Sequence, residues 1–414
     1  MKGMKEISTV ALCAGSPVNV NRMVTSSLRI PSIPLHTISC VPNQASTQSA
    51  TTIDMPIIGI GTYKFKKGSG DASRAIEEAL KLGYRQIDTA FIYGGEQTEK
   101  EVGSTLAAHF KNPAVPLSSK IERSDIFLTS KQWRAYHGYD ATLQCLKKSL
   151  ERLQTDYLDL YLIHWPGCAY NTMARSKKSM EESSDGPFVY AKDGHGRDEI
   201  QSLRAETWRA MEDSVYDGKC RAIGVSNFTI RHLEALKKTA RIWPPAVNQI
   251  ELHPYNPQKE LVEYCRKEGI VLQAYASLGG QDSGKKTWNV LGGKLLERDE
   301  VKAIAEKYQK MPAQVLLRWA TQQGFCVIPK SSNIEHMRLN LEAVSVFNGK
   351  NNGDDDENCA LINLSQEDME ALDTLDQSFI KSEDIDGSGE KRMIANKRAR
   401  LCWVRDPLKM LDFD

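Results

Sequence analysis

This sequence lacks the features that mark membrane, nucleic-acid-binding and disulfide-rich proteins. Among its 414 residues no apolar run approaches the roughly 20 residues that a membrane-spanning helix needs. The 54 Lys and Arg balance 53 Asp and Glu, which argues against a nucleic-acid partner or a polybasic membrane surface. The nine cysteines are scattered, with no CxxC pair and no tight His/Cys cluster. We therefore expect reduced thiols in a cytoplasmic protein, rather than disulfides or a metal site.

The first 50 residues differ in composition from the rest. They hold twelve Ser and Thr, four Lys and Arg, and one acidic residue, Glu6. This composition favours a disordered N-terminal extension. An organelle transit peptide is the alternative, because such peptides tend to be basic, rich in serine and poor in acids. We expect residues 51–414 to form a single domain.

From about residue 56 the chain alternates strand-like and helix-like segments. In residues 72–82, for example, Ile76, Ala79 and Leu80 share one helical face, and Gly83 ends the pattern. Eight apolar segments are candidate strands, at residues 57–60, 85–88, 126–131, 157–164, 220–225, 246–250, 270–275 and 325–328. Their spacing suits right-handed crossovers in a parallel sheet, and eight such units close into a (β/α)8 TIM barrel. We expect large loops and the tail from Phe379 to cover its mouth.

An open, doubly wound sheet is the alternative fold. Such a sheet would need a glycine-rich fingerprint after its first strand, and a helix would begin directly at that fingerprint. Gly59 and Gly61 begin such a pattern, but its last glycine is missing and no helix follows at once. The pattern therefore favours the barrel.

Four polar residues fall where candidate strands end. Asp88 closes one strand with Tyr93 five residues later, and Lys131 and His164 close two others. A parallel barrel gathers the carboxyl ends of its strands on one face, where barrels of this kind carry out their chemistry. An acid, a phenol, an amine and an imidazole would meet there and form a proton-handling site. Taken singly, each residue favours a structural interpretation, with Asp88–Lys131 as an ion pair of the barrel and His164 as a core histidine.

The segments around these residues resemble the motifs of the aldo-keto reductase family. The resemblance spans roughly residues 54–346 and resumes weakly near Trp403. It rests on GYRQIDTA (83–90) with Tyr93 and Glu96, LIHWP (162–166), GVSNF (224–228), NQIELHP (248–254) and IPKSS (328–332).

The resemblance implies NADPH-dependent reduction of an aldehyde or ketone to an alcohol. Tyr93 would be the general acid, with hydride coming from the nicotinamide. A free phenol has a pKa of about 10, and Lys131, held by Asp88, would favour the phenolate. His164 would donate a hydrogen bond to the substrate oxygen. Because the family branch that reduces C=C bonds carries a glutamate at this position, His164 favours carbonyl reduction.

The resemblance also implies a set of cofactor contacts. Tyr275 would stack on the nicotinamide ring, and Ser226, Asn227 and Gln249 would bond its carboxamide. The other implied cofactor contacts are Leu278, Lys330, Ser331, Ser332, His336 and Asn340. Of these, Lys330 and its neighbouring hydroxyls would bind the 2′-phosphate of NADP near a helix N-terminus.

Two positions depart from the family pattern. His336 stands where many members carry an arginine that clamps the phosphate, and Ala276 where many carry a serine. An imidazole offers no bidentate fork, so we expect NADP with weaker discrimination against NAD. We also expect 2′-phosphate binding to strengthen as the pH falls and His336 takes up a proton.

The substrate pocket would be lined by Tyr63, Trp133, His164 and Trp165, an aromatic wall that suits a small carbonyl molecule. We expect a monomer whose partner is that substrate. A redox-sensing, cofactor-binding regulatory subunit with little turnover is the alternative on the same fold. A metal-dependent barrel hydrolase would want a His-x-His pair at a strand end, which the sequence lacks.

Overall fold

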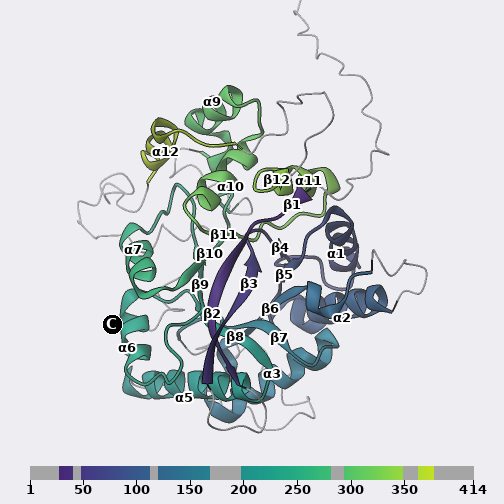
Figure 1. Cartoon of the computed structure of the whole chain (residues 1–414), viewed down its shortest axis with the longest axis vertical. Helices are drawn as coiled ribbons and strands as arrows, with labels where there is room; N and C mark the ends of the chain where they lie inside the picture. The colour runs from purple at the N-terminus through teal and green to yellow at the C-terminus, as the bar shows by residue number, and fades with distance from the viewer. Residues whose placement is uncertain are drawn as a thin grey trace, which may run out of the picture.

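The computed structural model describes residues 28–40, 48–111, 120–167, 197–280, 293–347 and 362–376. Its centre is an eight-stranded sheet in which the strands lie side by side in chain order (Figure 1). The strands are β4 (Ile60–Gly61), β5 (Gln86–Asp88), β6 (Phe127–Gln132), β7 (Leu158–Ile163), β8 (Cys220–Ser226), β9 (Val247–Glu251), β10 (Val271–Tyr275) and β11 (Cys326–Val327).

The sheet closes on itself. Every consecutive pair of strands is parallel. Ile58, just before β4, forms a parallel bridge with Val327 of β11, and the Gly59 N–H donates to Val327 O at 2.9 Å. The predicted (β/α)8 barrel is therefore confirmed.

Helices follow the strands and cover the outside of the barrel. They are α1 (Asp71–Leu82), α2 (Gln97–Phe110), α3 (Tyr139–Leu153), α5 (Arg197–Tyr216), α6 (Ile230–Lys237), α7 (Lys259–Glu268), α9 (Asp299–Lys307), α10 (Pro312–Gln322) and α11 (Ile334–Glu342). In α1 the predicted face of Ile76, Ala79 and Leu80 is buried, and Gly83 ends the helix with a φ of 105°. Among the described residues, no helix has both the length and the apolarity to span a bilayer.

Short 3₁₀ turns enter some of the helices and strands. They are η1 (Tyr93–Glu96), η3 (Arg123–Asp125), η4 (Arg134–Tyr136) and η5 (Leu295–Glu297). The helix α12 (Gln366–Asp373) lies against α9, where Lys307 Nζ is 2.9 Å from Asp368 Oδ1. The tail from Phe379, which we expect across the mouth, lies outside the described residues.

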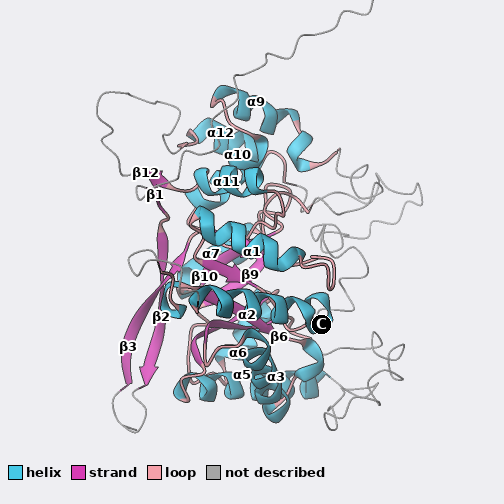
Figure 2. Cartoon of the chain, turned by 90° about the vertical axis from the view of Figure 1, so that its right-hand side faces the viewer, coloured by secondary structure: helices cyan, strands magenta, loops and turns pink. Residues whose placement is uncertain are grey.

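An antiparallel hairpin of β2 (Ser32–Cys40) and β3 (Gln48–Pro56) flanks the barrel strands (Figure 2). Leu35 and Met55 on its inner face are fully buried in the core. Before it, β1 (Leu28–Arg29) pairs with β12 (Val346–Phe347). Residues 28–29, 32–40 and 48–50, which the composition assigns to a loose extension, are thus strand, because alternate apolar side chains of the hairpin pack on the barrel. Residues 1–27 and 41–47 lie outside the described part of the chain.

Candidate functional site

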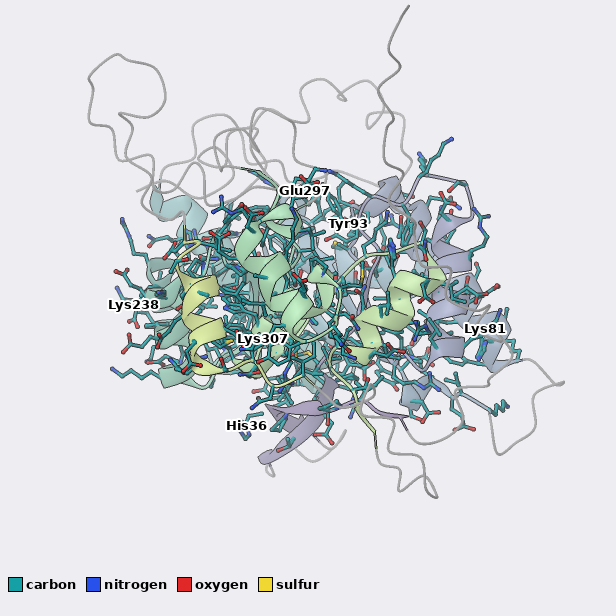
Figure 3. All side chains as sticks on the ribbon, turned by 90° about the horizontal axis from the view of Figure 1, so that it is seen from above. His36, Lys81, Tyr93, Lys238, Glu297 and Lys307 are labelled. Carbon is teal, nitrogen blue, oxygen red and sulfur yellow. The ribbon has the colours of Figure 1, made fainter. Side chains whose placement is uncertain are left out.

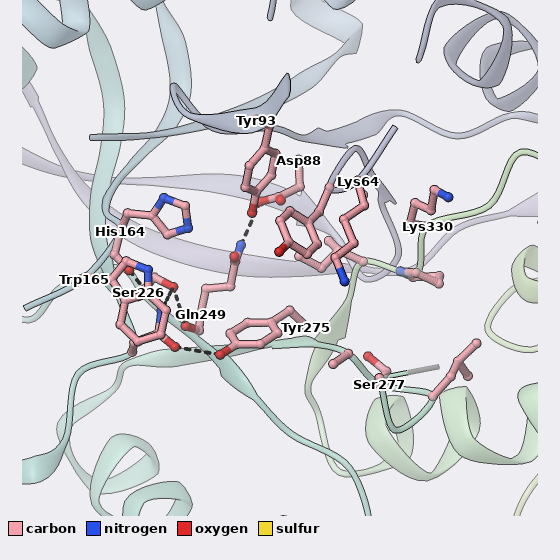
Figure 4. A pocket seen from close by; sticks show the side chains of 18 residues that line it. Lys64, Asp88, Tyr93, His164, Trp165, Ser226, Gln249, Tyr275, Ser277 and Lys330 are labelled. Atoms are coloured by element: carbon pink, nitrogen blue, oxygen red, sulfur yellow. Dashed lines mark hydrogen bonds between the residues drawn. The ribbon is translucent and has the colours of Figure 1, made fainter. Parts of the chain in front are cut away.

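A cavity of about 290 Å³ opens at the carboxyl ends of the barrel strands (Figure 4). The residues around it come from segments far apart in the chain, because each strand contributes the residues at its end. Asp88, Tyr93 and His164 line the cavity. Lys131 lies behind them, and the four residues of this tetrad therefore meet at one site.

The acid and the amine of the tetrad form a buried ion pair. Asp88 ends β5, and Lys131 lies in β6, which pairs with it. Lys131 Nζ donates to Asp88 Oδ1 at 2.6 Å and lies 3.5 Å from Tyr93 Oη. Gln249 Nε2 donates to the other carboxylate oxygen at 2.7 Å (Figure 4). Because both of its oxygens are bonded, the carboxylate holds the ammonium in one place beside the phenol.

Burial lowers the pKa of the Lys131 ammonium, and the charge and hydrogen bonds of Asp88 oppose that effect. The Lys131 side chain is 0% exposed and that of Asp88 3% exposed. Water therefore contributes little to stabilising the cation, and the carboxylate is what keeps it charged. The cation in turn lies where a phenolate would form.

His164 follows β7, and its ring centroid is 5.7 Å from that of Tyr93. Burial lowers its pKa well below 6.5, and the cations of Lys131 and Arg134 lower it further. The ring is therefore neutral at physiological pH and can donate one hydrogen bond. Its Nδ1 is buried and has no hydrogen-bond partner among the described residues.

A second group of predicted residues lines the cavity opposite the tetrad. Asn227 Nδ2 donates to His164 O at 2.9 Å, and its Oδ1 accepts from Tyr275 Oη at 2.7 Å. Ser226 Oγ donates to Gln249 O at 2.8 Å. Gln249 Nε2 also donates to Gln273 Oε1 at 2.6 Å, so both of its amide hydrogens are directed to protein acceptors. The predicted carboxamide contacts thus lie together.

The other predicted cofactor contacts are only partly gathered at the cavity. Leu278 and Lys330 line it, with Lys330 Nζ 4.9 Å from the Phe65 ring centroid. Four others are not among the lining residues: Ser331, Ser332, His336 and Asn340. Ser332 and His336 are exposed on the surface, whereas Asn340 is buried in α11.

The N-terminus of α11, a predicted source of phosphate donors, is capped by its own chain. Asn333 Oδ1 accepts from the backbone N–H groups of Glu335 and His336. Ser331 Oγ in turn accepts from the Asn333 N–H at 3.0 Å. These donors are therefore already bonded, and the side chains of Lys330 and His336 are better placed to meet an anion.

The aromatic wall is present in part. Tyr63 and Trp165 line the cavity, and the Tyr63 ring centroid is 5.1 Å from that of Tyr93. Trp133 is not among the lining residues, although its ring centroid is 5.7 Å from that of His164. Most of the predicted substrate loops, residues 168–196 and 281–292, lie outside the described residues.

Sequence patterns do not single out several residues that line the cavity. One of them, Lys64, has a left-handed backbone with a φ of 62°. Such a conformation is usually signalled by glycine, so a lysine gives no indication of it. Gly61 is different, because a Cβ there would lie 2.6 Å from Ile328 O. The glycine pair that begins the rejected fingerprint therefore marks a close approach of two strands.

No group of three or more His, Cys, Asp and Glu side chains in the described ranges is placed to hold a metal ion. The described cysteines Cys145, Cys220, Cys265 and Cys326 are free and buried. The titratable side chains of the tetrad that line the cavity are a carboxylate, a phenol and an imidazole, and the ammonium lies behind them.

Comparison with known proteins gives consistent matches. The model of the aldo/keto reductase family matches residues 57–351. A glyoxal reductase of Bacillus subtilis is 39% identical over 325 residues, 78% of this chain and 90% of the relative. A glycerol 2-dehydrogenase (NADP⁺) of Hypocrea jecorina is 35% identical over 291 residues, 70% of this chain and 85% of the relative.

A solved structure agrees with these relatives. The crystal structure of an aldo/keto reductase from Brucella melitensis is similar to this chain with a TM-score of 0.59 and 32% identity. The match covers 85% of this chain and all of the other. From the family match, the barrel and the shared motifs we conclude that this chain belongs to the aldo-keto reductase family.

Proposed function

We propose that this protein reduces an aldehyde or ketone to an alcohol with NADPH, and that Tyr93 gives the proton. The observation that carries the proposal is the buried Lys131–Asp88 pair, whose ammonium lies 3.5 Å from the phenol oxygen. Family membership supports carbonyl reduction as the reaction class. The identity of the proton donor and the choice of cofactor are our own assignments.

The donor set of the cavity suits a nicotinamide cofactor. When bound, the reduced nicotinamide would supply the hydride for the carbonyl carbon. Tyr275 would cover one face of its ring, while Ser226, Asn227 and Gln249 Oε1 would meet its carboxamide. We assign Lys330 to the 2′-phosphate, with Ser331, Ser332, His336 and Asn340 nearby. The Hypocrea jecorina relative is a glycerol 2-dehydrogenase (NADP⁺), which supports this choice.

The residues of the tetrad then act at the substrate oxygen. As negative charge develops on that oxygen, Tyr93 Oη donates its proton, and the Lys131 ammonium stabilises the phenolate left behind. The neutral His164 ring donates a hydrogen bond to the same oxygen and orients the substrate. We assign Tyr63, Trp133 and Trp165 to the substrate wall, and we propose that the protein acts as a monomer in the cytoplasm.

The direct test is NADPH oxidation measured against a panel of aldehydes, ketones and keto-sugars, with Tyr93→Phe beside the parent. We expect at least one substrate to be reduced and kcat to fall about 10²–10⁴-fold in the variant. Tyr139→Phe is the matched control. Tyr139 lies in α3, does not line the cavity, and donates a hydrogen bond from its phenol to Asp213 at 2.7 Å. Equal turnover by Tyr93→Phe would show that another group gives the proton. NADPH binding without turnover of any substrate would favour the regulatory-subunit alternative.

A further inference from the structure

The segment that carries Tyr93 has an irregular backbone. It follows β5 through Phe91 into η1, where Gly94, Gly95 and Glu96 have positive φ angles of 59°, 58° and 84°. Two glycines adopt such angles readily, but Glu96 does so at a cost. Contacts with the rest of the protein must therefore hold the phenol where it is.

Arg152 makes these contacts from both sides of Tyr93. Its guanidinium carbon lies 4.1 Å from the Phe91 ring centroid, two residues before the phenol. Its Nη2 is 2.9 Å from Glu96 Oε1, three residues after the phenol. Arg152 itself is only 9% exposed and does not line the cavity. One side chain thus contacts the segment both before and after Tyr93.

A second branch of the same contacts reaches the strand that carries Lys131. Arg152 Nη1 is 3.3 Å from Glu99 Oε2, and Glu99 Oε1 accepts from Ser130 Oγ at 2.6 Å. Ser130 directly precedes Lys131 in β6. Glu99 is fully buried, and burial raises its pKa, whereas the hydrogen bonds of Ser130 and Ser149 and the charge of Arg152 oppose that effect. The arginine therefore links both partners of the Tyr93–Lys131 pair.

Arg152 is well placed to act as a fixed point. It lies in the last turn of α3, and α2 packs against this turn through Gly103. A Cβ at Gly103 would lie 2.3 Å from Arg152 O, so the two backbones are in close contact. This packing leaves the arginine backbone little freedom to move.

We infer that Arg152 is a positioning residue, which holds the Tyr93 phenol beside Lys131 through Phe91, Glu96 and Glu99. The inference deepens the proposed function and rests on it, because it concerns how the proposed proton donor is held. Arg152 does not line the cavity and has no described contact with the tetrad. It would therefore affect turnover only by fixing the position of the segment that carries Tyr93.

Arg123 provides a matched control with the same chemistry at another place in the barrel. It bonds the buried Asp159 at 2.8 Å, and its guanidinium carbon lies 4.0 Å from the Tyr157 ring centroid. It precedes β6, at the strand end remote from the cavity. Loss of either arginine removes a buried ion pair and a ring contact, but only Arg152 touches the Tyr93 segment.

The experiment compares Arg152→Met with Arg123→Met in carbonyl reduction and in thermal unfolding. We expect both variants to unfold at lower temperature. We expect only Arg152→Met to lose kcat, by about ten- to hundredfold, because small misplacements of a reacting group are costly. KM for the carbonyl and Kd for NADPH should change less than about threefold, since neither site is touched. An unchanged kcat in Arg152→Met, or an equal loss in Arg123→Met, would overturn the inference.

A double-mutant cycle with Tyr93→Phe separates this inference from the proposed function. If Arg152 acts through the phenol, Arg152→Met should change kcat of the Tyr93→Phe variant by less than about twofold. A further loss as large as in the parent would refute the positioning role. Full activity of Tyr93→Phe would instead refute the proton-donor assignment. Should Arg152→Met fail to fold, Glu96→Gln replaces it, because the Glu96 side chain is 52% exposed and its loss disturbs the fold less. We expect this variant to lose less kcat than Arg152→Met. An unchanged kcat in Glu96→Gln would refute the inference.

Discussion

At the tetrad end of the cavity, Lys131 and Asp88 form an ion pair with side chains that are 0% and 3% exposed. Charged side chains such as those of Lys81 and Lys238 lie at the outer edge of the molecule (Figure 3). Near the N-terminus of α11, here called the α11 end, the Arg338–Glu335 pair is 40% and 57% exposed. One end would handle a proton and the other would bind a phosphate. The charges at the tetrad end are therefore shielded from water, whereas those at the α11 end are exposed to it.

The difference indicates which contacts exist before a ligand arrives. A buried charge without its partner is strongly unfavourable, so the tetrad has one low-energy arrangement. Exposed ion pairs are screened by water and contribute little. At the α11 end, an exposed ion pair such as Arg338–Glu335 can therefore open at little cost when an anion binds. We expect substitutions at the tetrad end to cost both stability and activity, and substitutions at the α11 end to change affinity.

The largest expected effect is that of Lys131→Met. The free energy of unfolding should fall by about 3–5 kcal/mol, because Asp88 is left buried without its cation. Urea unfolding measures this loss, and carbonyl reduction should cease. Arg338→Met is the comparison at the α11 end, where we expect a loss below about 1 kcal/mol.

The double variant Asp88→Asn/Lys131→Met tests whether charge is the cause. Removing both charges should restore much of the lost stability but none of the activity. If the double variant is as unstable as Lys131→Met, the loss comes from packing of the lysine stem rather than from the unpaired carboxylate.

The next effect concerns His137, which supports the cavity wall from behind. Its Nε2 lies 3.1 Å from Trp165 O and its Nδ1 3.1 Å from Thr207 Oγ1. Because a carbonyl only accepts, Nε2 carries a hydrogen and donates it. Burial, together with the cations of Arg204 and Arg134, lowers the pKa of His137 to about 3, so the ring is neutral at physiological pH.

This pKa sets a direction for acid stability. An unfolded histidine binds a proton below about pH 6.5, whereas folded His137 does not until about pH 3, so unfolding takes up a proton in between. The free energy of unfolding should fall by about 4–5 kcal/mol over this range. His137→Gln should remove that part of the slope, whereas His336→Gln at the exposed end should leave it unchanged. Parallel stability–pH curves for the parent and His137→Gln would contradict the assignment.

The sequence predicts the residues at the tetrad end of the site better than those at the α11 end. Asp88, Lys131 and His164 each close an apolar run, and the barrel topology alone brings strand ends together. Asn333 has the residue type of an N-cap, which was the signal that the α11 donors bond within the chain. The contacts of Arg152 give no comparable signal, because they join two helices across a distance in sequence that no local pattern spans.

The hairpin shows a different limit. Ile33 and Leu35 are separated by Pro34, and Ile53 and Met55 by Asp54, which is the two-residue period of a half-buried strand. The Ser- and Thr-rich composition around them favours disorder, and composition outweighs a pattern of two apolar residues. Only packing against the barrel core decides between the two interpretations.

The smallest expected effect belongs to His336 at the exposed end. An arginine at this position would offer a bidentate fork to a phosphate, which an imidazole does not. His336→Arg should therefore bind NADPH about two- to fivefold more tightly than the parent, the size of an exposed ion pair. Glu335 lies beside His336 and is shared with Arg338, which keeps the effect small. NADH lacks the 2′-phosphate, so its Kd should be the same in both proteins. Equal Kd values for NADPH in the parent and His336→Arg would show that this position takes no part in phosphate binding.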